Sequence, residues 1–380
     1  MFSQIYQNII LKNPKSVFLI LLITLLSFGY YSKDFRLDAS SETLLIEGDP
    51  DLKYLQEISK RYGSKEFLIL TYTPNEGMVS DTSVNNLLSL KYKIQSLDWV
   101  YSVITLLDIP LLNSSDVPLQ ERLVNFKTLK DEDIDRDRGF KEIISSPVFR
   151  NFVINEDGKT SGIIVYIKKN DTKIIDPTIK SKKEIEESKD LIKKQNHQNI
   201  LEIRDVIKSY ENIGKIHLGG IPMIADDMMS FIKSDIIVFG IGVLLFIIAT
   251  LWFVFRKLIW IIVPISSCFF SVIIMMGVLG LLGWKVTVIS SNFIALMLIL
   301  TMAMNIHMST RFLQLKENYP NKNILELIVL TTNKMFWPIL YTVLTTVIAF
   351  LSLIFSEIKP IIDFGWMMTL GLITSFLITF

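Results

Sequence analysis

Long apolar runs flank a polar middle segment: one lies near the N-terminus and five follow in succession after residue 235. A helix needs about 20 mostly apolar residues to cross a hydrocarbon core about 30 Å thick. We therefore predict six transmembrane helices, at 16–31, 236–255, 258–282, 286–308, 335–355 and 361–380. No small-residue cleavage site follows the first, so we predict a retained helix, with a cleaved signal peptide as the alternative.

The segment between the first two predicted helices alternates short β-type runs with helical periodicity. Residues 66–73 are rich in strand formers, and Asp157-Gly158 is a strong hairpin signal between runs at 148–154 and 162–168. We also predict a strand at 100–109, helices at 83–97 and 183–210, and a last strand leading into 219–222. This order predicts an inserted ferredoxin-like α/β sandwich of the split βαβ type.

The basic residues of the short loops predict the orientation of the chain. A cytoplasmic N-terminus places eight Lys and Arg residues inside and two outside, which is the usual bias. We therefore divide the chain into 1–32 with the first helix, an extracytoplasmic domain at 33–234, and five helices at 235–380. The last helix runs to Phe380 without a polar flank, so we expect the first half of a longer protein.

Composition then excludes several classes of protein. Of the 77 charged residues, only 13 lie from Asp235 onward, which is incompatible with an ordinary soluble protein. A net charge of +1 gives no reason to expect a nucleic-acid partner. One cysteine and three histidines form no metal-ligand pattern, and no phosphate-binding loop occurs. With no nucleophile–base pattern either, we expect neither an enzyme nor a bound cofactor.

Four short motifs, in this order and with this arrangement of helices, resemble a known family. They are FRLDAS at 35–40, GGIPMIADD at 219–227, IHMSTRF at 306–312 and DFGWMM at 363–368. Together they are similar to the MMPL-type predicted exporters of the resistance–nodulation–division (RND) superfamily, over essentially the whole chain. Helices 2–6 also look like the sterol-sensing domain of Patched-type proteins. The resemblance implies efflux of hydrophobic or lipid-like molecules across the inner membrane, driven by an ion gradient, by a protein with two such halves.

The fourth predicted helix departs from the RND pattern. Many RND pumps carry one or two aspartates there as a proton relay, and the corresponding residue here is Ala303. The candidate transport or coupling residues are therefore Asn292, Thr301, Asn305 and His307, with Asp363 at the start of the last helix. Thr301 and Asn305 share a helix face, and His307 lies about 200° away from Asn305. Hydrogen bonding between helices and a role in transport both remain open.

Two further patterns concern the ends of predicted helices. Asp226 and Asp227 are predicted in the first turn of the second helix, where acids favour the helix dipole; a substrate-entrance role is the alternative. Apolar residues between basic ones across 311–334 predict an amphipathic helix on the cytoplasmic membrane surface.

Two functions are compatible with these patterns. The first is the N-terminal half of a secondary transporter, with the lipid bilayer, a hydrophobic or lipid-like substrate, a second RND half and a homo-oligomer as expected partners. The second is a non-transporting membrane protein that binds sterol or lipid, or scaffolds partners.

Overall fold

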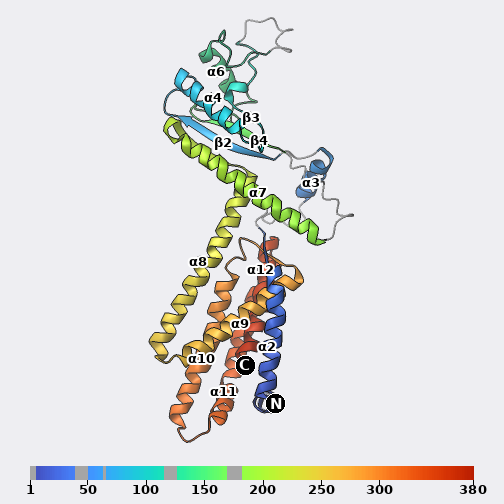
Figure 1. Ribbon diagram of the computed structural model, residues 1–380, viewed down its shortest axis with the longest axis vertical. Helices are drawn as coiled ribbons and strands as arrows, with labels where there is room; N and C mark the ends of the chain where they lie inside the picture. The colour runs from blue at the N-terminus through green and yellow to red at the C-terminus, as the bar shows by residue number, and fades with distance from the viewer. Residues whose placement is uncertain (1–5, 39–49, 63–65, 115–125, 169–181) are drawn as a thin grey trace. The chain divides into compact units, whose positions relative to one another are not determined.

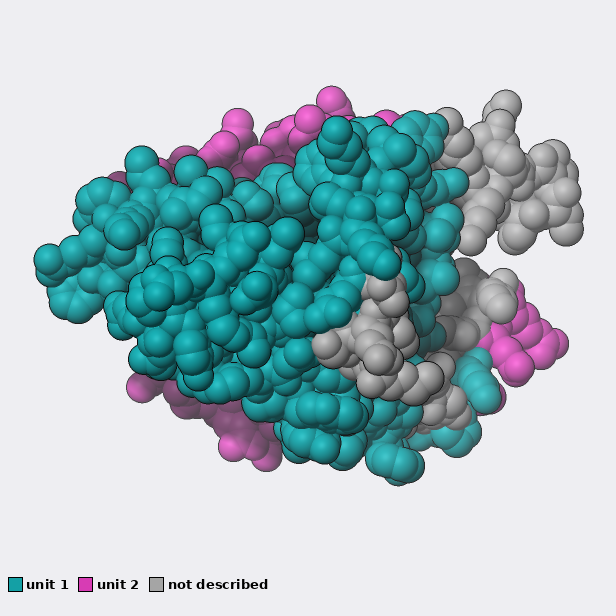
Figure 2. All heavy atoms as spheres, turned by 90° about the horizontal axis from the view of Figure 1, so that it is seen from below, with its two compact units in different colours: residues 1–53, 228–380 teal, residues 54–227 magenta. Residues whose placement is uncertain are grey.

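The structure is a computed structural model, and it describes residues 6–38, 50–62, 66–114, 126–168 and 182–380. The chain forms two units. Unit 1 combines residues 1–53 with 228–380, and unit 2 comprises residues 54–227 (Figure 2). Each unit has its own apolar core, so they are described separately.

Within the described residues, six helices are long and apolar enough to cross a membrane, as the sequence predicts (Figure 1). They are α2 (Pro14–Tyr31), α8 (Ile221–Phe255), α9 (Ile259–Leu282), α10 (Phe293–Asn318), α11 (Ile324–Leu351) and α12 (Lys359–Thr379). Helix α8 begins 15 residues before the predicted start, because its first turns belong to unit 2.

Helices α9, α10 and α12 form the interior of unit 1. In α9 and α10, 44% of the apolar segment is buried, against 11% in α8 and α11. Met275 of α9, Met297 of α10 and Met367 of α12 are almost completely buried in one apolar cluster. Methionine is unbranched and adapts to irregular gaps, which suits a core between three helices.

Glycines bring α2 against α9. A Cβ atom added at Gly277 or Gly280 of α9 would overlap the backbone carbonyl groups of Phe28 or Tyr31 in α2. The two backbones therefore approach closely, as small residues permit between membrane helices.

A short parallel β-ladder joins two connections of unit 1. Strand β1 (Arg36–Leu37) pairs with β6 (Lys285–Val286), and Lys285 Nζ lies 3.3 Å from Asp38 Oδ2. The helix predicted to begin at residue 286 therefore begins at Phe293, which is a correction. Residues 287–292 instead form turns, in which the Thr287 amide donates to Ser290 Oγ at 2.8 Å.

The predicted amphipathic surface helix at 311–334 is also wrong. Helix α10 continues to Asn318, and α11 begins at Ile324 and runs through Pro338 without interruption. Leu327 and Thr331 are buried while Ile324 and Leu325 are exposed, so one face of the start of α11 packs against the bundle.

Unit 2 contains a four-stranded antiparallel sheet in the order β3-β4-β2-β5. Helix α4 follows β2 in the chain, α6 lies between β3 and β4, and α7 connects β4 to β5 (Figure 1). The bounds are β2 (Phe67–Pro74), α4 (Asp81–Gln95), β3 (Val100–Ile104), α6 (Arg136–Ser145), β4 (Ser161–Ile167), α7 (Lys182–Ser209) and β5 (Gly214–Gly219), with α3 (Pro50–Tyr62) before them.

The core of unit 2 lies on one face of this sheet. Leu68, Leu70 and Tyr72 of β2 are completely buried, together with Leu87 of α4 and Ile203 of α7. Both helices therefore cover the same face, and the apolar alternation of the strand sets which face it is.

Two predicted strands of unit 2 differ in the structure. Residues 148–154 form no strand: they turn at Asn151, which has a positive φ of 65°, and meet the start of β4 through an Ile154–Ser161 bridge and a bond from the Gly162 amide to the Val153 carbonyl. Strand β3 ends at Ile104 instead of 109, because Thr105 caps a 3₁₀ helix at Leu106–Asp108. Local side-chain caps compete with the ladder in both segments.

Candidate functional site

Buried polar side chains of α10 and α12 meet a partly buried serine of α9 in unit 1. Thr301 Oγ1 lies 2.7 Å from Ser375 Oγ of α12, and either oxygen is able to donate. The Asn305 amide donates to Ser267 Oγ of α9 at 3.1 Å and to the Thr301 carbonyl at 2.9 Å. We call Ser267, Thr301, Asn305 and Ser375 the polar cluster.

The polar cluster is held by helix geometry. Thr301 and Asn305 are four residues apart, so they share the face of α10 that the sequence predicts. Thr301 is completely buried, Ser375 is 1% exposed and Asn305 is 8% exposed. Hydroxyl and amide groups do not change charge near neutral pH. The cluster can therefore exchange hydrogen bonds between three helices, but none of its members takes up a proton.

The remaining α10 positions lie away from the polar cluster. His307 and Ala303 are both exposed in unit 1, which fits the predicted angle between His307 and Asn305. Ala303, the position that the sequence aligns with the relay acid of RND pumps, therefore lies on a different face of α10 from the buried amide.

Two predicted site residues are not brought to the cluster. Asn292 is exposed at the N-terminus of α10 and makes no side-chain cap hydrogen bond. Asp363 is partly buried in the first turns of α12. It lies about 18 Å along the helix axis from Ser375, at 1.5 Å per residue.

The structure adds residues that sequence reasoning did not select. The sequence does not distinguish Ser267 and Ser375 from other helix hydroxyls. Only the packing of the three helices shows that they face α10. The Thr369 hydroxyl of α12 is buried without a hydrogen-bond partner among the described residues. Such groups are uncommon, and the local sequence around Thr369 gives no signal of it.

Asp226 and Asp227 bind helix α7. Asp226 Oδ1 lies 2.9 Å from His197 Nδ1 and accepts from it when that nitrogen carries the proton, and Arg204 donates to both carboxylate oxygens of Asp227 at 2.7 and 2.8 Å. The Asn196 amide also donates to the Pro222 carbonyl at 2.9 Å. The first-turn prediction is wrong, since α8 begins at Ile221 and has no acid in its first turn. The acids connect α8 with α7, and the entrance role stays a prediction.

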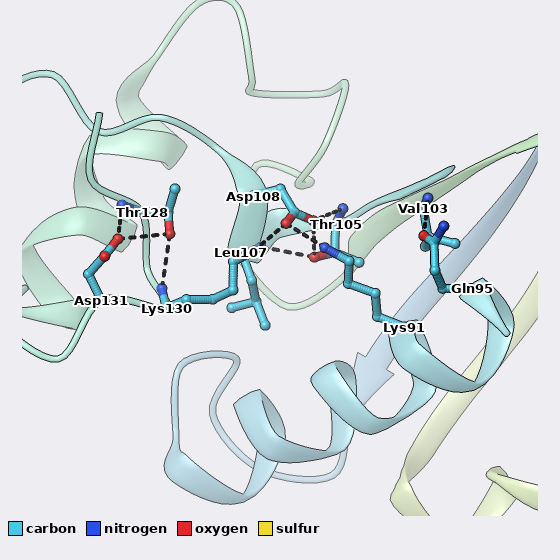
Figure 3. A network of polar contacts seen from close by, with 9 residues as sticks. All are labelled: Lys91, Gln95, Val103, Thr105, Leu107, Asp108, Thr128, Lys130 and Asp131. Carbon is cyan, nitrogen blue, oxygen red and sulfur yellow. Dashed lines mark hydrogen bonds and ion pairs between the residues drawn. The ribbon is translucent and has the colours of Figure 1, made fainter. Parts of the chain in front are cut away.

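A second charged network lies beside β3 in unit 2 (Figure 3). Asp108 Oδ1 accepts from Lys91 at 2.5 Å and Lys130 at 2.6 Å, and its Oδ2 accepts from the Thr105 amide at 2.8 Å. Burial alone would raise the pKa of Asp108, but the bonds from Lys130, Lys91 and Thr105 outweigh it and lower the pKa to about 2. This carboxylate stabilises the fold and is not poised to exchange a proton at neutral pH.

Metal-binding geometry is not found in the described part of the chain. No group of three or more His, Cys, Asp or Glu side chains there could hold a metal ion. The single cysteine, Cys268, is buried in α9 with its Sγ 3.7 Å from the Leu298 carbonyl.

Comparisons with known proteins agree with this architecture. The sequence model of the MMPL family matches residues 184–380, which include α8 to α12 and the polar cluster. No curated protein matches the chain. The family match together with six apolar helices identifies a multi-pass membrane protein. Since the match covers more than half of the 380 residues, the chain belongs to the MMPL family.

Proposed function

We propose that the chain is one half of an RND-type secondary transporter that exports hydrophobic or lipid-like molecules and uses an ion gradient. It performs no covalent chemistry and needs no cofactor. The polar cluster is the observation that carries the proposal. Buried polar side chains in a membrane bundle are costly, and they mark transport pathways and moving interfaces more often than chance.

The polar cluster is better suited to an interface between helices that move than to carrying a proton. Thr301–Ser375 and Asn305–Ser267 join α10 to two neighbouring helices through one hydrogen bond each. Such bonds contribute about 0.6–2 kcal/mol in membranes, so α10 is able to exchange them as it shifts. In this proposal a second RND half, different in sequence, supplies the titratable group that couples transport to the gradient.

Unit 2 serves as the extracytoplasmic porter domain in this proposal. Its sheet order and its two helix connections on one face support the ferredoxin-like split βαβ fold. The eight-to-two split of basic residues in the short loops supports a periplasmic location beside the inner membrane.

The proposed location has a direct test. Asp157→Cys in unit 2 and Asn321→Cys in the α10–α11 loop both place a thiol at an exposed position, while native Cys268 is buried. In intact cells an impermeant maleimide should label the first variant only. Labelling of the second variant from outside would reverse the orientation.

A second function rests on Ala303. Apart from Glu317 in its last turn, α10 carries no carboxylate, and helices without a relay acid could bind sterol or lipid without transporting it, as a sensor or scaffold does. The two functions differ in whether a bound molecule crosses the membrane.

The chain reconstituted together with a second RND half in sealed liposomes separates them. A fluorescent lysophospholipid, whose charged head group slows unaided crossing, should move from the side on which it is loaded to the other only when a proton or sodium gradient is present, and an ionophore should stop it. Thr301→Val should lower the rate, and Thr345→Val, whose hydroxyl bonds only to α11 itself, should not. Binding without gradient-dependent movement would favour the second function.

A further inference from the structure

One face of the sheet in unit 2 stays partly open and is apolar at one end. Phe67 and Ile69 of β2 are 42% and 39% exposed, in alternation with the buried residues of the core face. The register pairs them with Tyr166 and Ile164 of β4, and Ile164 with Ile104 of β3. The rings of Phe67 and Tyr166 lie 6.1 Å apart. These five residues form the apolar patch.

The same face becomes polar and basic further along β2. Thr71 pairs with His217 of β5 and Thr73 with Lys215, and both of these β5 side chains are exposed. Paired residues point to the same face of a sheet, so Lys215 and His217 belong to the face that carries the apolar patch. Thr73 Oγ1 also bonds to Thr160 Oγ1 at 2.8 Å. We call Lys215 and His217 the basic edge.

The distance between the apolar patch and the basic edge follows from strand geometry. A strand rises about 3.4 Å per residue, so Thr71 lies about 7 Å and Thr73 about 14 Å from Ile69 along β2. The apolar patch is therefore wide enough for several methylene groups, and the basic edge begins within one short chain segment of it. An occupant that matches both regions is apolar over most of its length and carries negative charge at one end.

We propose that this face binds a free fatty acid, with the alkyl chain on the apolar patch and the carboxylate at the basic edge. The inference rests on the proposed function, because it names the substrate class that unit 2 receives. The positive charge of Lys215 selects the head group: a cationic amphiphile is repelled there, and a neutral ester gains no ion pair. The apolar patch favours a carboxylic acid with a long alkyl chain over a small carboxylate.

Photolabelling of the intact chain in nonionic detergent tests the proposal. Palmitate with a diazirine near its methyl end should label peptides that contain β2 and β4, and unlabelled palmitate should compete. Ile69→Asp, and separately the pair Lys215→Glu and His217→Glu, should lower labelling at least tenfold. Leu201→Asp and Lys208→Glu on the exposed side of α7 are the matched controls and should leave labelling unchanged.

Competition in the unaltered protein keeps the test independent of folding defects. Palmitate should compete at least tenfold better than its methyl ester or hexadecyltrimethylammonium. Equal competition by the three, or labelling spread without preference for β2 and β4, would overturn the proposal. A second result would also overturn it: the unaltered protein is a dimer, Ile69→Asp makes it a monomer, and palmitate does not change the oligomeric state. A second copy of the chain would then cover the face. Photolabelling and competition use no ion gradient. A failure to bind palmitate therefore leaves the transport proposal to its own test, and a failure to transport leaves this binding result unchanged.

Discussion

Units 1 and 2 place polar and apolar side chains in opposite ways. In unit 2, Leu68, Leu70 and Leu90 are completely buried, and the charged side chains of α4 and of α7 from residue 190 onward mostly face outward. In unit 1, Phe246 and Phe253 of α8 are 73% and 76% exposed. Eleven of the sixteen buried polar residues among the described ones belong to unit 1. The contrast follows from the solvent that each unit meets.

This difference in burial shows which forces stabilise each unit. Apolar burial from water stabilises unit 2, at roughly 25 cal/mol per Å². Between helices in lipid this driving force is absent, so close backbone approach and hydrogen bonds stabilise unit 1. Mutations should therefore act through different contacts in the two units, and the following predictions test that separation in order of expected effect.

The largest effect is expected where two backbones touch in unit 1. Gly277→Ala should destabilise the bundle by about 3 kcal/mol, because the added Cβ meets the Phe28 backbone, which has no rotamer to change. Gly240→Ala in α8 is the control, since nothing lies within 4 Å of its Cβ position. Thermal unfolding in detergent should show a lower midpoint for the first variant only. An equal change in the unfolding midpoints of both variants would mean that helix propensity, and not packing, determines the effect.

The next effect tests a charge contact in unit 2. Asp108→Asn should cost about 2 kcal/mol at pH 7, because the pKa of Asp108 falls from 3.8 to about 2 on folding and each pKa unit is about 1.4 kcal/mol. A lowered carboxyl pKa contributes its full stability above about pH 4 and loses it as the pH falls toward 2. Hydrogen exchange of residues 100–108 should therefore speed up at pH 7 and converge with the parent protein near pH 2. Asp133→Asn, an exposed carboxylate that pairs with Lys127, should leave exchange unchanged.

The smallest effect concerns the polar cluster. Thr301→Val keeps the shape of the side chain but removes the bond to Ser375, so it should cost about 0.6–2 kcal/mol. Thr345→Val should cost less, because its hydroxyl bonds to the Tyr341 carbonyl of its own helix. Unfolding midpoints in the same detergent compare the two. A larger cost for Thr345→Val would contradict the assignment of the cluster as an interhelical contact.

Much of this architecture could be predicted from the sequence, because it depends on local patterns. The six spans follow from apolar length, and the strand at 66–73 and the helix at 183–210 follow from periodicity. The shared face of Thr301 and Asn305 also follows from helix geometry.

The rest depends on contacts between distant residues. The two-residue ladder of β1 and β6 is too short to leave a pattern, so the sequence extended α10 over it. The partners of Asn305 and Asp227 lie on other helices, 38 and 23 residues away, and no spacing rule connects them. For the same reason the sequence placed Asp226 and Asp227 at a free helix start and missed their bonds to α7.

The central claim is that the polar cluster of unit 1 works through hydrogen bonds and carries no proton. The pH dependence of gradient-driven transport in liposomes tests it most directly, with His307→Gln and Asn305→Ala compared to the parent protein. We predict that Asn305→Ala lowers the rate by a similar factor at every pH, and that His307→Gln lowers it modestly without changing the shape of the profile. A folded, inserted His307→Gln protein that has lost gradient-driven transport, or whose profile has become flat, would contradict the account and identify His307 as the proton carrier.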